Sequence, residues 1–293
     1  MQGESGFHRR KCPFVFFRIR EVAKRGWFVA AICRMTSPYR ADPGSCNHGR
    51  VPVYRDEGVV LRTTPLAEAD RIITVLTRRN GRVRAVAKGV RKTSSRFGSR
   101  LEPGTYVDLM LHSGRSLDTV TQADIISPYG TTIALDYARH TAAAVMLETA
   151  ERLTSEERQP ALRLFLLLVG GLRTLAAGKR PAPLVLDAFL LRSLAVSGYG
   201  MALDDCARCG EPGQHLSLSV AGGGVVCPQC RPHGAASVSA GAVRLLTDLL
   251  RGDWDGALAS EARARREAGG IVAAYLQWHL ERGLRALPHL ERA

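Results

Sequence analysis

The chain has 293 residues, 45% of them apolar, and a net charge of +14 at pH 7. This size and apolar content exclude a small domain that depends on disulfides and leave room for two or three domains with hydrophobic cores. The pI of about 10.0 favours acidic partners, with nucleic acid first and an anionic membrane surface second.

Residues 1–50 differ from the rest of the chain. They carry ten Lys or Arg against three Asp or Glu, and their short apolar runs keep no lasting period. These runs fall far below the roughly 18 residues that span a bilayer, so we expect no membrane partner. A secretory signal or an Arg-rich transit peptide fits part of this composition. We favour a disordered tail, or an upstream stretch translated from a start codon placed too early.

Residues 51–128 have the pattern of short strands joined by tight turns. Asn80-Gly81 is a strong hairpin signal within this segment. Several strands within about 75 residues favour a small closed or Greek-key barrel, because closure removes exposed edges, and an open sheet is the alternative. We expect strands at residues 57–62, 69–77, 82–88, 106–112 and 117–122.

From residue 129 onward the apolar residues recur three and four positions apart, as in helices. We expect a helical domain in two parts, residues 129–203 and 234–293, interrupted by a cysteine-containing insertion at 204–233. Trp254 and Trp278 are expected in its core. The helices are expected at residues 133–153, 161–176, 183–196, 241–250 and 271–287.

Four cysteines form two Cys-x-x-Cys pairs, Cys206 with Cys209 and Cys227 with Cys230. Seventeen residues separate the pairs, which lies within the spacing expected of a four-cysteine zinc site. Gly210 allows the backbone to curl back after the first pair. Four thiolates fill a tetrahedron, so we expect one structural zinc ion per chain with no open position for water or substrate.

Two disulfides, four reduced thiols or a redox-active pair are the alternatives for these cysteines. Disulfides need an oxidising compartment, and redox pairs usually occur singly at the start of a helix. His215 and His233 lie nearby and could replace a cysteine, but we interpret both as solvated residues. A four-thiol zinc site fits a reducing compartment, so we expect a cytoplasmic location.

Segment 71–101 contains ten Lys or Arg and no Asp or Glu. Its middle part, residues 88–100, is a Gly- and Ser-rich loop that offers cations, hydroxyls and backbone N–H groups, as a phosphate backbone requires. A solvated surface loop is the alternative. Phe97 could stack on a base or pack against the barrel, and the sequence leaves both open.

Motifs of the common catalytic sites are absent from the sequence. It contains no Gly-x-x-x-x-Gly-Lys-[Ser/Thr], no His-Glu-x-x-His and no dinucleotide fingerprint, and no Ser/His/Asp set stands out. We therefore expect neither enzymatic activity nor a nucleotide cofactor.

Four segments and the two cysteine pairs carry a family resemblance. The segments are Tyr54-Arg-Asp-Glu-Gly-Val-Val-Leu61, Glu68-Ala-Asp-Arg-Ile72, Gly81-Arg-Val-Arg-Ala-Val-Ala-Lys-Gly-Val-Arg91 and Ser95-Arg-Phe-Gly-Ser-Arg-Leu-Glu-Pro103. Taken in order, these features resemble the RecO family of bacterial recombination mediators. The resemblance covers about residue 53 to the C-terminal end and is strongest over residues 54–125.

The resemblance implies an α+β multidomain chain: an N-terminal OB barrel, then an all-α domain with an inserted four-cysteine zinc knuckle. It also implies DNA repair and recombination in the RecF pathway, with binding of single- and double-stranded DNA and annealing without ATP. The implied partners are RecR, the acidic tail of single-strand-binding protein, and RecA, which is loaded onto coated strands at the bacterial nucleoid. The DNA-contact candidates that carry over are Arg84, Lys88, Arg91, Lys92, Arg96 and Arg100.

A protein of a different class remains the second hypothesis. In that case the helical domain and the zinc insertion bind proteins, and the basic loop only steers DNA without a specific role.

Overall fold

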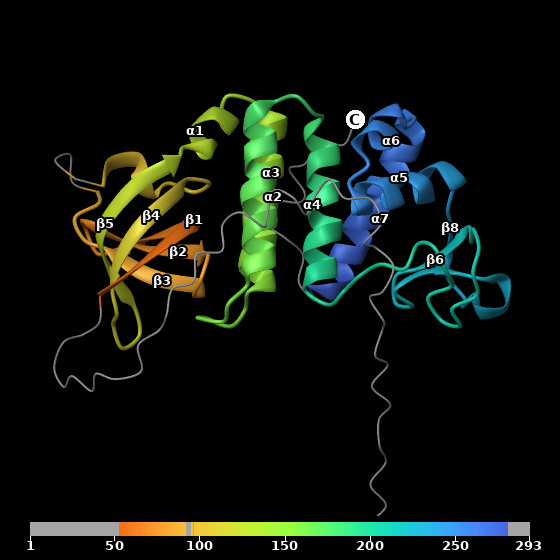
Figure 1. The fold of residues 1–293 in the computed structure, drawn as a ribbon, viewed down its shortest axis with the longest axis horizontal. Coiled ribbons are helices and arrows are strands. Elements are labelled where there is room, and N and C mark those ends of the chain that lie inside the picture. Colours follow the sequence, from red (N-terminus) through yellow and green to blue (C-terminus); the bar gives the residue numbers. More distant parts are fainter. Residues whose placement is uncertain (1–52, 92–94, 96, 281–293) are drawn as a thin grey trace, which may run out of the picture. The chain divides into compact units, whose positions relative to one another are not determined.

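The computed structural model describes residues 53–91, 95 and 97–280, so the predictions for residues 1–50 lie outside the described part. Two compact parts follow one another in the described chain, a barrel and a helical domain (Figure 1). The barrel is built from β1 (Val53–Leu66), β2 (Asp70–Thr77), β3 (Gly81–Ala87), the short 3-10 helix η1 (Gly98–Leu101), β4 (Tyr106–His112) and β5 (Asp118–Ser127).

The barrel is closed, in the strand order β1-β2-β3-β5-β4, so the closed alternative is confirmed over the open sheet. Neighbouring strands are antiparallel except at the closing seam, where β3 and β5 run parallel. Only Ala85 with Asp118 and Val86 with Thr119 pair across this seam. The first half of β3 therefore has no strand partner on that side.

Side chains alternate between the two surfaces of the barrel wall, as strand geometry requires. Val60, Ile73 and Leu109 belong to the buried interior cluster. Leu61 and Leu76 belong instead to the large core of the helical domain. The outer wall of the barrel thus supplies part of the apolar surface against which the helices pack.

The helical domain is arranged around one central helix, α4 (Ala182–Val196), which is buried over most of its surface. It packs against α2 (Tyr137–Leu153), α3 (Leu162–Ala177), α5 (Ala240–Arg251) and α7 (Ala262–His279). A helix that is apolar on nearly all sides needs such a covering layer. The helices are α1 (Tyr129–Ile133), α2 (Tyr137–Leu153), α3 (Leu162–Ala177), α4, α5 (Ala240–Arg251), α6 (Trp254–Ala259) and α7 (Ala262–His279).

The two tryptophans expected in the helical core behave differently. Trp254 is partly buried against that core, and the guanidinium carbon of Arg180 lies 4.1 Å from the centre of its ring. Trp278 is 58% exposed, so the expectation for it was wrong. Helix α7 buries Val272 and Leu276. Trp278 follows Leu276 by two positions and therefore points about 200° away from it around the helix axis, toward solvent.

The cysteine-containing insertion folds as a small sheet with two tight turns. Its strands are β6 (Ser217–Ser219), β7 (Gly224–Val226) and β8 (Ala236–Ser237), in the order β7-β6-β8, and the 3-10 helix η2 (Pro228–Cys230) follows β7. The fold therefore has the predicted class: a closed five-stranded barrel, then helices with a four-cysteine insertion.

Candidate nucleic-acid interface and metal centre

Strand β3 carries Arg84, the first DNA-contact candidate, on the outer surface of the barrel. Ala85 is buried inside, whereas Arg82 is half-buried and Arg84 is exposed. The strand begins at Gly81, which adopts a φ of +64° after the Asn80-Gly81 turn. Glycine tolerates this conformation. The turn fixes the register of β3, and the register places Arg82 and Arg84 on the outer surface of the barrel.

The turn that follows β3 presents two more candidates, Lys88 and Arg91, both exposed. The backbone N–H of Gly89 donates to Oδ1 of Asp70 at 2.7 Å. The backbone N–H of Arg91 donates to the carbonyl of Ala69 at 3.0 Å. The turn is therefore tied to the start of β2. Both side chains are exposed, and Nη1 of Arg91 also donates to the carbonyl of Ala67 at 3.3 Å.

The remaining candidates lie in or near η1. Arg100 is exposed, and its Nη1 lies 3.5 Å from the carbonyl oxygen of Ala123 in β5. Lys92 and Arg96 lie outside the described residues. Lys88 and Arg91 thus share one turn, and Arg84 lies on the strand just before it.

Phe97 is only 3% exposed and packs in the interior cluster of the barrel. The sequence left two roles open for Phe97, stacking on a base and packing against the barrel, and the structure shows packing. A buried ring offers no face on which a base could stack. Phe97 therefore anchors the loop that carries the cations.

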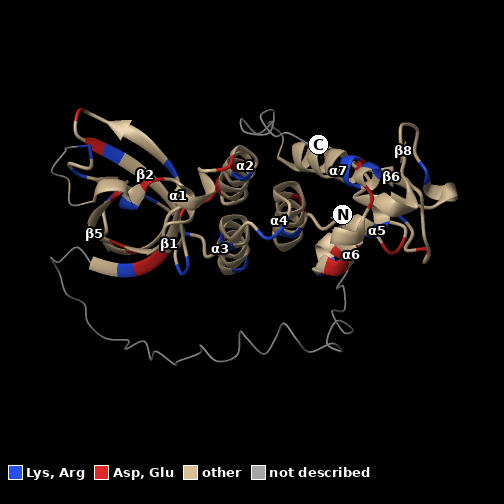
Figure 2. Ribbon diagram, turned by 90° about the horizontal axis from the view of Figure 1, so that it is seen from above, with Lys and Arg blue, Asp and Glu red and all other residues tan. Residues whose placement is uncertain are grey.

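Several cations of segment 71–101 are paired with acids from elsewhere in the chain. Arg71 pairs with Glu102 at 2.7 Å, and Arg78 pairs with Glu57 at 3.2 Å. Figure 2 accordingly shows both blue and red segments on the barrel strands. The absence of acids along the segment thus overstates the free positive charge at its surface.

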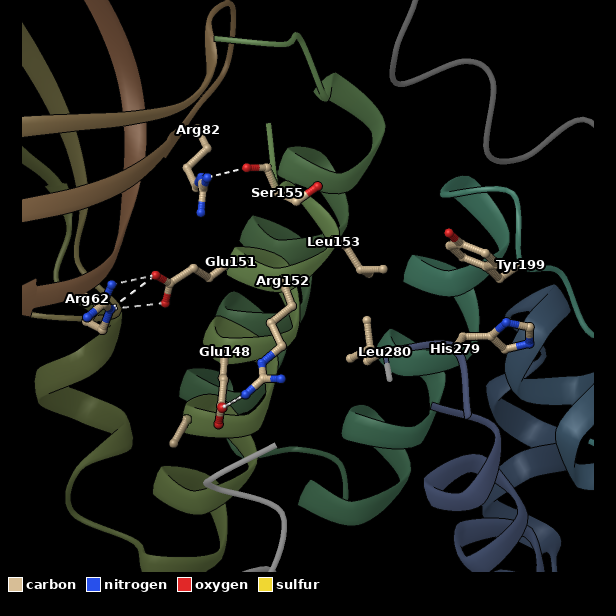
Figure 3. A pocket seen from close by; sticks show the side chains of 11 residues that line it. Arg62, Arg82, Glu148, Glu151, Arg152, Leu153, Ser155, Tyr199, His279 and Leu280 are labelled. Carbon is tan, nitrogen blue, oxygen red and sulfur yellow. Dashed lines mark hydrogen bonds and ion pairs between the residues drawn. The ribbon is translucent and has the colours of Figure 1, made fainter. Parts of the chain in front are cut away.

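Arg84 is paired too, with Glu157 of the connection between α2 and α3. We call residues 154–161 of this connection the strap. Its backbone follows the free first half of β3: Arg82 and Glu157 form a parallel bridge, and the N–H of Arg158 donates to the carbonyl of Arg82 at 2.9 Å. Arg82 also donates to the carbonyl of Ser155, as Figure 3 shows. The strap therefore covers an edge that would otherwise be open.

A buried carboxylate anchors the strap to the barrel. Asp118 is fully buried and accepts hydrogen bonds from Tyr54 Oη, from Arg158 Nη2 and, at 3.0 Å, from the N–H of Gly114. A buried charge needs such partners, because an unpaired one is costly. The sequence signal for the strap is weak, since a polar run between two helices is typical of any solvated connection.

A cavity of about 940 Å³ lies beside the strap, between the barrel and the helices (Figure 3). Its charged lining is mostly paired: Arg62 with Glu151 at 2.9 Å and Arg152 with Glu148 at 3.0 Å. Paired charges of both signs give the cavity no clear preference for an anion or a cation.

The four cysteines come together as the spacing predicted. Their sulfur atoms all lie within 4.8 Å of one another, and the Sγ atoms of Cys209 and Cys227 are 3.7 Å apart. Two sulfurs on a tetrahedral zinc ion would be about 3.8 Å apart, given Zn–S bonds of about 2.3 Å. The cluster can therefore hold a metal ion of this size and geometry.

Tight turns place these sulfurs. Gly210 adopts a φ of +76° and donates its N–H to the carbonyl of Cys206 at 2.8 Å. His215 instead places its Nε2 2.9 Å from the carbonyl oxygen of Glu211. Within the described residues the cluster consists of the cysteines alone.

The four cysteines are close enough to shift one another's pKa. The backbone N–H of Cys227 donates to the sulfur of Cys206 at 3.3 Å and lowers the pKa of that thiol to about 6. The neighbouring sulfur of Cys209 raises the pKa of Cys230 to about 12. Four thiolates cannot share this space unless a cation offsets their charge, and metal binding displaces the protons.

The described helices are all too short or too polar to cross a bilayer. Fold and site together define a class of protein, an OB-like barrel joined to a helical domain that carries a four-cysteine cluster. The sequence models of two families match the chain: recombination protein O N terminal over residues 51–129, and recombination protein O C terminal over 134–288.

Similar proteins named DNA repair protein RecO occur in several bacteria. That of Frankia casuarinae is 90% identical over 243 residues, which is 83% of this chain and 100% of the relative. Those of Thermobifida fusca and Streptomyces griseus are 61% and 57% identical, each over 82% of this chain and 99% of the relative. The chain therefore belongs to the RecO family of DNA repair proteins.

Proposed function

We propose that the protein is a non-enzymatic recombination mediator that binds single- and double-stranded DNA and anneals complementary strands without ATP or another nucleotide. The observation that carries this proposal is the exposed turn with Lys88 and Arg91 on a small barrel of a DNA repair family. Cations on a fixed turn can bind the phosphates of any sequence. Annealing needs such sequence-independent binding, because either strand must be accepted.

The proposed DNA-contact residues are those of the turn and its surroundings. Arg84 and Arg100 flank the turn among the described residues, and Lys92 and Arg96 continue its charge in the sequence. The four-cysteine cluster is proposed to hold one structural zinc ion per chain through Cys206, Cys209, Cys227 and Cys230. Four sulfur ligands leave no position for water or substrate, so the ion would stabilise the insertion only.

The proposed partners follow from the family resemblance of the sequence motifs. They are RecR, the acidic tail of single-strand-binding protein, and RecA, which the mediator would help to load onto coated strands in the RecF pathway. The proposed place of action is the bacterial nucleoid in the cytoplasm.

An annealing assay tests this proposal. Two complementary oligonucleotides, one with a fluorophore and one with a quencher, are mixed with and without protein in the absence of nucleotide. We expect the protein to accelerate duplex formation at low salt and to lose this effect as salt rises. An annealing rate that the protein leaves unchanged at low salt would contradict the proposal.

The adaptor hypothesis gains some support from the ion pairs of the barrel. Arg71, Arg78 and Arg84 are each paired with an acid, which reduces the charge available to DNA. The Lys88→Ala/Arg91→Ala double variant separates the two functions. A mediator should lose DNA affinity, whereas an adaptor should keep nearly all of it and still bind RecR.

A further inference from the structure

The pairing of Arg84 places an acidic side chain on one of the proposed DNA contacts. Building on the DNA-binding function proposed above, we propose that Glu157 of the strap competes with DNA phosphate for Arg84. In the free protein Glu157 holds this guanidinium. When DNA binds, a phosphate replaces the carboxylate, so the strap lowers the affinity of the barrel for DNA.

The position of Glu157 is fixed by the backbone and not by a chance contact of a long side chain. Glu157 is bridged directly to Arg82, on the same strand and the same outer surface as Arg84. At Gly81, a Cβ atom would lie 1.8 Å from the carbonyl oxygen of Gln159, so the two backbones are in close contact. The strap thus presents Glu157 to Arg84 whenever it is docked.

The ion pair is open enough for an anion to replace the carboxylate. The side chains of Arg84 and Glu157 are 44% and 31% exposed. Exposed ion pairs contribute little to stability, because water solvates both charges. A phosphate offers the same paired oxygens to a guanidinium and forms equally directional hydrogen bonds. The exchange therefore replaces one good partner of Arg84 with another.

The strap can stay docked while this exchange takes place. Its second ion pair, Arg158 with Asp118, ends on a carboxylate that is fully buried and also bonded to Tyr54 and Gly114. DNA cannot reach this acid. The N–H of Arg158 keeps its bond to the carbonyl of Arg82 as well. Only the side chain of Glu157 has to move.

Fluorescence anisotropy of a labelled oligothymidine, measured over a series of salt concentrations, tests the competition. In the Glu157→Gln variant we expect the affinity to rise by about threefold, the size of an exposed ion pair. The log–log salt slope should stay close to that of the wild type, because Arg84 contacts a phosphate in the DNA complex of both proteins. A glutamine oxygen can still accept from Arg84, so the strap is expected to dock as before.

Two further variants make the test specific. Glu156→Gln removes the same charge from the neighbouring exposed residue, for which no contact with Arg84 occurs among the described residues, and should raise the affinity much less. Arg84→Ala, placed in the Glu157→Gln background, should abolish the gain. Equal gains in the two glutamine variants, or a gain that persists without Arg84, would overturn the competition.

The outcomes also separate this competition from DNA binding itself. If the wild-type protein binds the oligonucleotide and Lys88→Ala weakens binding, but Glu157→Gln has no effect, only the role of Glu157 is refuted. If no variant binds at low salt, the DNA-binding function and the competition both fail.

Discussion

The Nε of Arg84 donates to Oε1 of Glu157, although the two residues are 73 positions apart in the sequence. This contact joins a barrel strand to the connection between two helices. The positive charge that Arg84 can offer to DNA therefore depends on the strap, which belongs to the helical domain. Stability of the docked strap and affinity for DNA should then respond to different residues of the same connection.

The close contact of the strap with Gly81 predicts a destabilising variant. Gly81→Ala adds a Cβ atom 1.8 Å from the carbonyl oxygen of Gln159, at a φ of +64°. We expect the free energy of unfolding to fall by about 2–4 kcal/mol, from backbone strain and from overlap. Urea unfolding measures this loss. Gly198→Ala is the control, because its φ is +92° and no described atom lies within 4 Å; an equal loss there would contradict the contact.

The buried carboxylate of Asp118 predicts a second loss of stability. Arg158→Ala removes one of its three hydrogen-bond donors, Arg158 Nη2. The expected decrease in the free energy of unfolding is about 1–3 kcal/mol, because a buried charge is left with fewer partners. Arg163→Ala in α3 removes the same charge from an exposed position and should have almost no effect. Equal stability of the two variants in thermal melts would show that Arg158 does not stabilise the buried carboxylate of Asp118.

Removal of the metal should loosen the insertion. We expect one zinc ion per chain in freshly purified, reduced protein, and none in Cys227→Ser. Because metal binding and local folding are coupled, this variant should lose several kcal/mol of local stability. Hydrogen exchange over residues 204–233 reports the loss. His233→Ala should retain the ion, and loss of zinc from that variant would show that the ligand set is wrong.

The pH dependence of stability should include a contribution from His279. Its ring lies 4.8 Å from that of Tyr199 and 4.5 Å from that of Tyr275, and burial lowers its pKa below 6.5. Below pH 6.5 the unfolded chain takes up a proton more readily than the folded one. This contribution is thus complete above pH 6.5 and is lost as the pH falls through the folded pKa.

A comparison of urea midpoints at about pH 7.5 and about pH 5.5 tests this sign. His279→Gln should lose less stability on acidification than the wild type does. His140→Gln, at an exposed position of α2, should behave as the wild type. A larger acid loss in His279→Gln than in the wild type would contradict the direction of the shift.

The sequence predicts the barrel and the cysteine cluster well, because both depend on local patterns. Alternation along β3, the Asn80-Gly81 turn and the spacing of the cysteine pairs act over a few residues each. Helix α7 is less well predicted, since it begins at Ala262 and not at 271. Its first turns bury only the small side chains of Ala264 and Ala268 among charged residues and glycines, which gives almost no hydrophobic signal.

The candidate DNA site is predicted only in part, because its charge depends on contacts between distant residues. The absence of acids from segment 71–101 says nothing about Glu157, Glu102 or Glu57, which lie outside the segment and pair with its arginines. Phe97 shows the same limit, since its burial depends on the closure of the whole barrel.

The salt dependence of single-stranded DNA binding tests the central claim most directly. With about five phosphate contacts, the wild-type protein should give a log–log slope of about −3.5, and Lys88→Ala/Arg91→Ala should give about −2.1 with weaker binding. Arg115→Ala, at another exposed position of the barrel, should leave the slope near −3.5. A slope that the double variant leaves unchanged, or a wild-type slope near zero, would contradict the assignment of this turn as the DNA-binding site.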